Sequence, residues 1–220
     1  NIRGKDSEFS PIPNAYLALD SNKKINLFCN LKKIDNNFKK KFKDIRFIDI
    51  RYTNLFLSKI KNKKILIDSS SCSIYFEDIL KRNNKITNFL DPIYFHKSIK
   101  SKIEIKNTIK SHIYDGAALT KFLFWIKKNY KKQNVNEISA QEKLLQFRKK
   151  NKDFKFLSFP TISGSGPNAA IIHYKASNES NRKLKKGDIY LVDSGGQYKF
   201  GTTDVTRTIC FSNQKKYIKN

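Results

Sequence analysis

The chain has 220 residues, and its 45 lysines and arginines against 19 aspartates and glutamates give a formal net charge of +26 at pH 7. Hydrophobic residues make up 39% of the sequence and aromatic residues 13%, which excludes an intrinsically disordered tail. No apolar run approaches the ~18 residues that a membrane span needs. This length predicts one or two domains, with enough residues to bury a hydrophobic core.

The first residue is Asn1, and the sequence contains no methionine. A translated chain starts with methionine, and a protein of this size normally contains several more. We therefore expect the sequence to be an internal fragment of a longer protein.

Lysine supplies most of the positive charge, since the chain has 38 lysines, 7 arginines, 27 isoleucines and 22 asparagines. A basic chain can bind nucleic acid or be attracted to an anionic membrane surface. Nucleic-acid interfaces favour arginine for its bidentate hydrogen bonds, however, and the lysines here are spread along the whole sequence. Lysine, isoleucine and asparagine all have AT-rich codons, so we interpret the charge as codon bias. We expect no specific nucleic-acid partner and no membrane partner.

The three cysteines, Cys29, Cys72 and Cys210, are far apart and form no Cys-x-x-Cys pair. This spacing argues against a disulfide framework and against a zinc finger. It is typical of a reducing compartment, and we expect a cytoplasmic protein.

The first part of the sequence, residues 1–98, mixes short strands with short helices. Two apolar runs flank a cluster of turn residues and predict a β-hairpin. The expected strands are 15–19, 25–29, 46–52 and 64–68, and the expected helices are 55–60 and 74–80. This order predicts an α/β domain with a mixed sheet.

The second part, residues 99–220, begins with a long amphipathic helix expected over about 101–128. Its apolar face is predicted to carry Ile105, Ile109, Ile113 and Ala117, and to continue through Phe122–Trp125. After the polar stretch 129–136, Ser139 is the predicted N-cap of a second helix that ends near residue 150. The strands expected after this helix are 154–159, 169–174, 188–193 and 202–211.

Two aspartates lie on either side of a glycine-rich turn near the end of the sequence. If the hairpin is symmetric about Tyr198 and Lys199, then Asp193 faces Asp204 on the neighbouring strand. Directly opposed Cβ atoms lie about 5 Å apart, so the two carboxylates repel each other unless they share a proton or a cation. Strands also disfavour aspartate. We interpret the pair as a divalent-metal site; the alternative is two solvated strand ends.

Another candidate is His173, in the apolar run 170–174, although a lone histidine on such a strand is ordinarily a packed core residue. Just before it, residues 164–169 match the Gly-x-Gly-x-x-Ala fingerprint of dinucleotide-binding proteins. That fingerprint must open a helix whose N-terminus holds the pyrophosphate. Because we expect a strand here, the sequence argues against nucleotide binding.

Several motifs of the second part occur together in one known family. They are Phe159-Pro160-Thr161-Ile162-Ser163, the segment 166–174, Leu191-Val192-Asp193-Ser194-Gly195 and the segment 201–208. Together they resemble the Xaa-Pro aminopeptidases (aminopeptidase P), specifically the three-domain branch. The likeness extends upstream to 1–4 and 11–18, to 111–125 and to 137–139.

The resemblance implies an α/β (α+β) fold in two parts. Residues 1–98 would be a middle domain of the creatinase N-terminal type with a mixed sheet, incomplete at its N-terminus. Residues 99–220 would be the first part of a pita-bread metallopeptidase domain, incomplete at its C-terminus. The implied activity is the metal-dependent release of an N-terminal residue that precedes proline, from a peptide with proline in second position.

The resemblance also implies a cofactor of two divalent metal ions, Mn²⁺ foremost. Asp193 and Asp204 would be metal ligands, with Asp204 bridging both ions. His173 would contact the substrate and help to stabilise the tetrahedral intermediate. The full-length protein would be a homodimer.

The family takes its other ligands, one histidine and two glutamates, from later strands, and residues 205–220 contain neither type. We therefore expect the 220-residue chain to be inactive alone. Two alternatives remain open, a non-catalytic pita-bread module that binds another protein and a basic polyanion-binding protein. Non-catalytic relatives usually lose the metal carboxylates, whereas Asp193, Asp204 and His173 are all present here.

Overall fold

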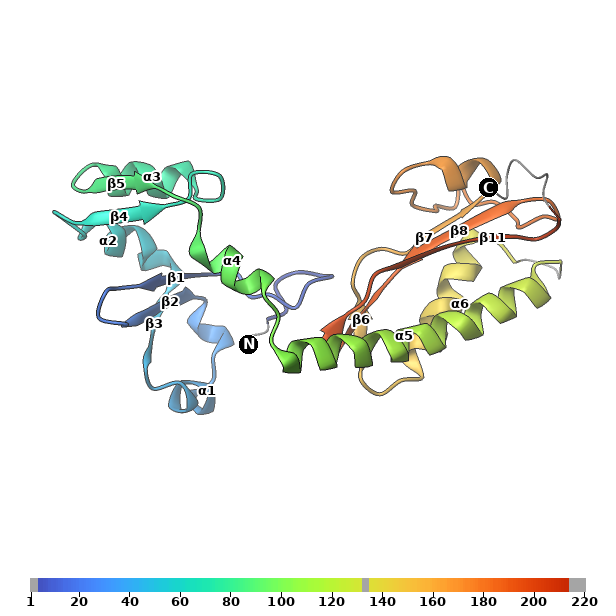
Figure 1. Cartoon of the computed structure of the whole chain (residues 1–220), viewed down its shortest axis with the longest axis horizontal. Helices are drawn as coiled ribbons and strands as arrows, with labels where there is room; N and C mark the ends of the chain where they lie inside the picture. Colours follow the sequence, from blue (N-terminus) through green and yellow to red (C-terminus); the bar gives the residue numbers. More distant parts are fainter. Residues whose placement is uncertain (1–3, 132–134, 214–220) are drawn as a thin grey trace. The chain divides into compact units, whose positions relative to one another are not determined.

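A computed structural model of the chain describes residues 4–131 and 135–213. The chain forms two compact units that divide between Lys100 and Ser101, and the short segment Glu8–Ser10 groups with the second unit (Figure 1). Some predictions concern residues that lie outside this description: the likeness at 1–3, part of the polar stretch 129–136, and the last part of the segment 205–220.

The first unit is a mixed α/β structure. Its strands are β1 (Ala15–Leu19), β2 (Ile25–Cys29), β3 (Ile45–Asp49), β4 (Lys64–Ile67) and β5 (Lys85–Asn88), and its α-helices are α1 (Asn36–Lys41), α2 (Thr53–Ser58), α3 (Ile74–Lys81) and α4 (Pro92–Ser98). In the sheet β1-β2-β3, the central strand β2 runs antiparallel to β1 and parallel to β3. β4 and β5 form a separate parallel pair.

The predicted hairpin of the first unit is confirmed, because β1 pairs with β2 from Ala15↔Cys29 to Leu19↔Ile25. The strand predicted at 46–52 ends earlier, at Asp49. The Asp49 carboxylate accepts a hydrogen bond from Arg51 N at 3.0 Å and so starts a short 3-10 turn instead of a further strand residue.

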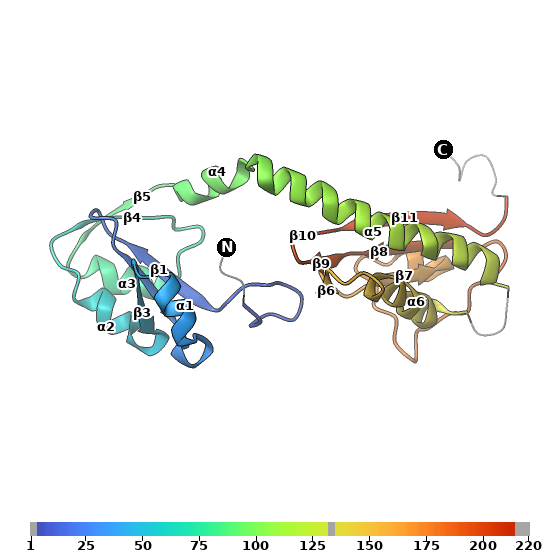
Figure 2. The same cartoon turned by 90° about the horizontal axis from the view of Figure 1, so that it is seen from below.

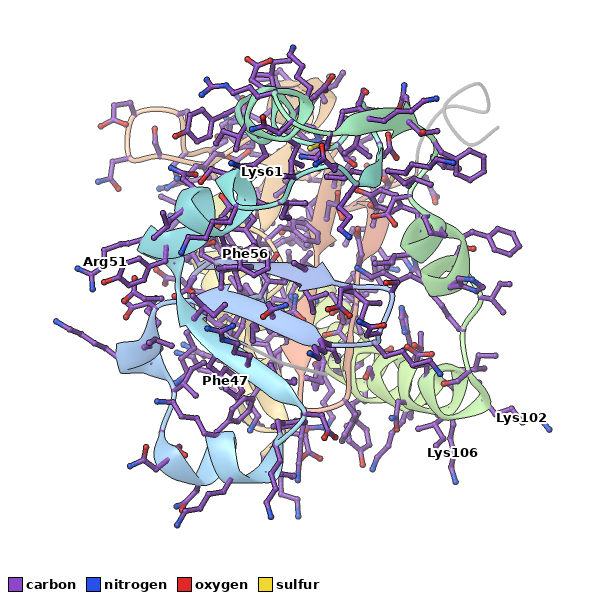
Figure 3. The ribbon with its side chains drawn as sticks, turned by 90° about the vertical axis from the view of Figure 1, so that its left-hand side faces the viewer. Phe47, Arg51, Phe56, Lys61, Lys102 and Lys106 are labelled. Carbon is purple, nitrogen blue, oxygen red and sulfur yellow. The ribbon has the colours of Figure 1, made fainter. Side chains whose placement is uncertain are left out.

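Aromatic side chains pack around the main sheet of the first unit. Phe28 on β2 is 1% exposed, and its ring meets Phe56 of α2 edge-on at a centroid distance of 5.0 Å. Phe47 on β3 meets Phe38 of α1 in the same way at 6.0 Å. Figure 3 shows that Phe47 and Phe56 come from β3 and α2. The apolar residues of β2 therefore form the core of this unit.

Over its described residues, the second unit consists of two α-helices, a short 3-10 helix and two small antiparallel sheets (Figures 1 and 2). The helices are α5 (Lys102–Asn129) and α6 (Glu137–Lys149), and the strands are β6 (Phe154–Leu157), β7 (Ile162–Ser165), β8 (Ile189–Ser194), β9 (Gly196–Tyr198), β10 (Gly201–Thr202) and β11 (Val205–Cys210). One sheet has the order β10-β9-β6 and the other β11-β8-β7. Both views show α5 and α6 on one side of the β8–β11 ribbon.

The core of the second unit lies between these helices and β8. It contains Phe122 and Ile126 of α5, Leu144 of α6, and Tyr190 and Val192 of β8, all of them fully buried. Burying a side chain of this size contributes roughly 1.5–3 kcal/mol. This apolar layer therefore holds β8 against the helices.

The predicted helix at 101–128 is confirmed as α5. Its predicted apolar face is confirmed at Phe122, which is fully buried, but is wrong in the first half of the helix. Ile105, Ile109 and Ile113 are exposed, by 50%, 57% and 63%. The buried face of the first half of α5 instead carries Ser111, which packs against Gly201, and Asp115, which pairs with Arg148. Lys102 and Lys106 project outward from the first turns (Figure 3). In the described residues, no helix is long and apolar enough to cross a membrane.

The second helix of this unit begins earlier than predicted. Asn136, not Ser139, is the N-cap of α6, and its side chain accepts a hydrogen bond from Ser139 N at 2.8 Å. In turn, Asn136 N donates a hydrogen bond to the Ser139 hydroxyl at 2.9 Å, which completes a capping box. This earlier start places Glu137 in the first turn of the helix.

A buried ion pair joins the two helices to the hairpin strands. Arg148 of α6 donates from Nε to Asp115 Oδ1 at 2.7 Å and from Nη2 to Asp115 Oδ2 at 3.0 Å, and both side chains are 0% exposed. The same Nη2 donates to Ser194 Oγ of β8 at 3.0 Å. Tyr198 of β9 donates its hydroxyl to Asp115 Oδ1 at 2.8 Å. Four elements therefore meet at one charged pair.

We predict that Asp115→Ala destabilises the second unit by about 3–5 kcal/mol, because Arg148 then stays buried without its counter-charge. Trp125 is the one tryptophan of the chain and lies in α5, so its fluorescence during urea unfolding follows this unit.

The matched variants separate charge from packing. The double variant Asp115→Leu with Arg148→Met removes both charges and should recover part of the loss. Glu142→Ala, at an exposed position of α6, should change the unfolding free energy by less than about 0.5 kcal/mol. A double variant less stable than Asp115→Ala would contradict the role of the unpaired charge.

Candidate functional site

The hairpin that carries the two aspartates has a different register from the predicted one. Tyr198 pairs with Gly201, so the turn is at Lys199 and Phe200, one residue later than expected. Asp193 consequently pairs with Thr206 on β11, and the predicted direct pairing of Asp193 with Asp204 is wrong. The turn geometry sets the register of a hairpin, and the glycines around this turn leave that register open in the sequence alone.

The structure nevertheless brings both aspartates and His173 to one cavity of about 360 Å³. Side chains alternate along β8, so Tyr190, Val192 and Ser194 face the helices and Asp193 faces the opposite side. Asp204 lies two residues before Thr206, which makes it a diagonal neighbour of Asp193. The other residues lining the cavity are Phe159, Pro160, Ile162, Tyr174 and Lys175.

The hairpin is interrupted between the two aspartates, where the chain passes from one sheet to the other. A Cβ atom added to Gly195 would lie 1.9 Å from the Thr203 carbonyl oxygen and 2.2 Å from Ser158 Oγ. Ser158 donates its hydroxyl to that same carbonyl at 2.8 Å, and Gly196 N donates to Thr203 Oγ1 at 2.9 Å. This close approach of the two strands needs glycine at position 195 and holds Asp193 near Asp204.

His173 does not lie on a strand, so the strand predicted at 169–174 is wrong. The chain forms a short 3-10 helix at Gly166–Ala170 and then a turn, in which His173 is exposed and has a φ of 54°. A positive φ is uncommon outside glycine, although histidine is among the residues that adopt it more readily. The turn presents the imidazole at the cavity instead of packing it into a core.

The structure also changes the argument about the dinucleotide fingerprint at 164–169. The motif does open a helical turn, so the expectation of a strand was the wrong reason to reject it. The side chain of Asn168 in this turn forms hydrogen bonds with other residues of the protein. Its Nδ2 donates to the carboxylate of Glu137 at 3.1 Å and to the Ser180 carbonyl at 3.0 Å.

Sequence reasoning did not single out Glu137 as a functional residue, and the structure shows it 0% exposed and hydrogen-bonded to the loop of His173. Its carboxylate accepts hydrogen bonds from Ser165 N at 2.7 Å, Arg182 N at 2.9 Å, the Tyr174 hydroxyl at 2.8 Å and the Asn168 amide. In a sequence, a glutamate in the first turn of a helix is explained by the helix dipole alone. Its partners lie 28 to 45 residues further along the chain, so local spacing does not reveal them.

The hydroxyls of Tyr174 and Tyr198 keep their protons. Burial raises the pKa of Tyr174, and the neighbouring carboxylate of Glu137 acts in the same direction. Burial also raises the pKa of Tyr198, with the negative charge of Asp115 as the next cause. Both hydroxyls therefore act as hydrogen-bond donors to a buried carboxylate.

Within the described part of the chain, the carboxylate of Asp193 has an unsatisfied oxygen that a metal ion would satisfy. Asp193 Oδ1 is buried and has no hydrogen-bond partner in residues 4–131 and 135–213. An unpaired buried carboxylate oxygen is costly, so it indicates a ligand that the protein atoms do not supply. Asp204 is exposed and presents a second hard oxygen donor on the same cavity.

The aspartates alone do not form a complete site. Over the described ranges, there is no cluster of three or more histidine, cysteine, aspartate or glutamate residues that could hold a metal ion. The described residues therefore contribute two carboxylates and one exposed imidazole to the cavity.

A mixed-sheet unit followed by a helix-backed antiparallel hairpin with two acidic residues defines a two-part α/β protein. Residues 106–220 match metallopeptidase family M24, and residues 1–104 match the creatinase/prolidase N-terminal domain. The chain belongs to metallopeptidase family M24. The resemblance drawn from the motifs is thereby confirmed.

Its relatives carry the name that the motifs indicated. The chain is 37% identical over 227 residues to the Xaa-Pro aminopeptidase ApepP of Drosophila melanogaster. The aligned region covers 100% of this chain and 36% of the relative. The chain is also 34% identical over 246 residues to aminopeptidase P2 of Arabidopsis thaliana, covering 96% of this chain and 34% of the relative. The chain thus spans about a third of the length of these relatives.

Solved structures confirm the fold. The X-prolyl aminopeptidase of Caenorhabditis elegans, described as a cytosolic enzyme with a di-nuclear active site, aligns with a TM-score of 0.86 and 27% identity over 98% of this chain and 36% of its own. Prolidase from Pyrococcus furiosus shares the fold at 19% identity, with a TM-score of 0.68 over 99% of this chain and 60% of its own. The predicted fold, a creatinase-type domain followed by the first part of a pita-bread domain, is confirmed.

We predict opposite effects from one substitution at two glycines of the second unit. Gly195→Ala should destabilise it by about 1–3 kcal/mol or more, because the new methyl group overlaps Thr203 and Ser158. Gly116→Ala in α5 meets no atom within 4 Å and should stabilise it by about 0.5–1 kcal/mol. Urea unfolding followed by Trp125 fluorescence measures both. Equal effects of the two variants would contradict the strand crossing at Gly195.

Proposed function

We propose that this chain is part of a metal-dependent aminopeptidase that releases the N-terminal residue preceding a proline. The observation that carries the proposal is the gathering of Asp193, Asp204 and His173 on one cavity, in a chain of family M24. The names of the relatives support the choice of an Xaa-Pro bond over other peptide bonds.

Each of the three residues has a role that suits its surroundings. Asp193 supplies a carboxylate held by a central strand, with one oxygen buried and unpaired, and Asp204 supplies a second carboxylate at the cavity; both would hold the two ions. Two divalent ions, for which we propose Mn²⁺, would supply a water of lowered pKa and neutralise charge on the substrate oxygen. The C. elegans structure, described as having a di-nuclear active site, supports the number of ions.

His173 is free to act on the substrate, because its ring is exposed at the cavity and its backbone is held in a turn. We assign it to donate a hydrogen bond to the carbonyl oxygen of the scissile bond as negative charge develops there. Phe159, Pro160 and Ile162 give the same cavity an apolar wall, which suits a substrate with a nonpolar ring next to the cleaved bond.

The wider properties follow the same family. We propose that the domain boundary lies at residues 98–99, that the complete protein is a cytoplasmic homodimer, and that it takes its further metal ligands from residues beyond those described. The description of the C. elegans relative as cytosolic supports the compartment. A non-catalytic binding module is the second reading, and the retention of both carboxylates on one cavity favours the enzyme.

We predict that a form of the protein carrying the further ligands hydrolyses Arg-Pro-Pro when Mn²⁺ is added. Asp204→Ala should abolish this turnover, because one of the two carboxylates that would hold the ions is removed. Release of free arginine, measured by chromatography, follows the reaction. Glu142→Ala, which removes an exposed carboxylate of α6, is the control and should retain full activity. Unchanged turnover in Asp204→Ala would overturn the assignment.

We also predict that the 220-residue chain alone shows no Mn²⁺-dependent turnover of the same peptide. The reason is that its cavity brings together two carboxylates, and two such ligands do not hold two metal ions against water. The same assay at equal protein concentration tests this. Clear turnover by the purified 220-residue chain would show that the described cavity is sufficient.

A further inference from the structure

We propose that Glu137 is a positioning residue for His173: it holds the loop 166–182 in the conformation that presents the imidazole at the cavity. This inference rests on the proposed role of His173 in substrate binding. Glu137 itself is 0% exposed and does not line the cavity, so it acts through the loop and not on the substrate.

The contacts of Glu137 are placed at the start, the middle and the end of this loop. Ser165 N, just before the loop, donates to Oε1 at 2.7 Å, and Arg182 N, at its end, donates to Oε2 at 2.9 Å. Between them, the Tyr174 hydroxyl lies 2.8 Å from Oε2. One carboxylate thus joins both ends and the centre of a loop that contains no strand (Figure 1, the orange segment after β7).

Tyr174 connects this carboxylate to His173, since the two residues are adjacent in the chain. Both residues line the cavity, but Tyr174 is 6% exposed and its hydroxyl reaches Glu137, whereas His173 is exposed. His173 itself has a left-handed backbone conformation, with a φ of 54°. A conformation of this kind costs roughly 1–3 kcal/mol and persists only where the surroundings impose it.

The environment of Glu137 requires a carboxylate and not an amide. Its partners are backbone N–H groups, an amide N–H₂ and a hydroxyl, and each of the two oxygens receives at least two of them. A carboxylate is acceptor-only, whereas a glutamine places N–H₂ on one side. In either orientation of that amide, N–H₂ would face a backbone N–H, Ser165 N on one side or Arg182 N on the other. Glu137→Gln therefore keeps the volume and removes the acceptor.

A second contact strengthens the connection from α6 to the sheet. Ser163 of β7 donates its hydroxyl to the Glu137 carbonyl oxygen at 2.8 Å and lies 2.7 Å from the Tyr190 hydroxyl of β8. The backbone of Glu137 is thus attached to the core while its side chain holds the loop. This division predicts that a side-chain substitution affects the loop more than the helix.

The experiment uses the 220-residue chain labelled with ¹³C and ¹⁵N at histidine, which requires neither metal nor turnover. The chain has three histidines, so its spectrum is simple, and His173→Gln identifies the signal of His173 by its disappearance. In Glu137→Gln we expect the His173 signal to move to its random-coil position or to broaden. The signal of His112, on α5 of the same unit, should stay in place.

Three further variants separate positioning from general loss of structure. Tyr174→Phe removes the hydroxyl and leaves the two backbone contacts of Glu137, so it should move the His173 signal part of the way. Combined with Glu137→Gln, it should add little. Glu142→Gln makes the same chemical change at an exposed position of α6 and should change nothing. Trp125 fluorescence must show that each variant has a folded second unit.

Turnover can be measured in a form of the protein that carries the further metal ligands. Misplacing a substrate-binding group by about 1 Å can reduce turnover by roughly 10²-fold, so Glu137→Gln should lower kcat to that extent with the affinity for Mn²⁺ unchanged. A His173 signal that stays in place in a folded Glu137→Gln chain would overturn the positioning role. A signal that moves, while no form of the protein cleaves Xaa-Pro peptides, would support positioning and refute the proposed function.

Discussion

The second unit depends on one charged contact that has no access to water, the pair of Arg148 and Asp115. Both side chains are 0% exposed, and the fork of the guanidinium meets both carboxylate oxygens at 2.7 and 3.0 Å. A buried pair of this kind contributes little net stability compared with apolar packing, but either partner alone is strongly destabilising. It therefore acts as a geometric constraint, because α5 and α6 must meet at one relative position.

That constraint reaches the cavity through the residue next to Asp193. Arg148 also donates to Ser194, and Asp115 accepts from Tyr198, so the ion pair holds β8 and β9 on either side of Gly195. At the other end of α6, Glu137 accepts hydrogen bonds from Tyr174 and Arg182 of the loop that contains His173. Two buried carboxylates, one balanced by a cation and one by neutral donors, thus support a cavity whose own carboxylates are more accessible.

Much of the fold was predictable from the sequence, and the misses have a common cause. The hairpin at β1 and β2 and the long helix α5 follow from patterns within a few residues, and both are confirmed. The isoleucine stripe of α5 was assigned to the core, yet the buried face carries Asp115, because a distant arginine pairs with it. The segment 169–174, expected to be a strand, is a turn in which His173 has a left-handed conformation. The apolar composition of this segment does not indicate such a conformation.

The sequence by itself determined the family, the first hairpin, the long helix α5 and the identity of the three candidate site residues, since motifs and periodicities depend on neighbours in the chain. Only the tertiary structure decided the register that pairs Asp193 with Thr206, the cavity shared with Asp204, and the buried contacts between Glu137 and the loop of His173. The physical reason is separation along the chain. Hydrogen bonds between residues 33 to 45 positions apart are made by folding, and no local pattern encodes them.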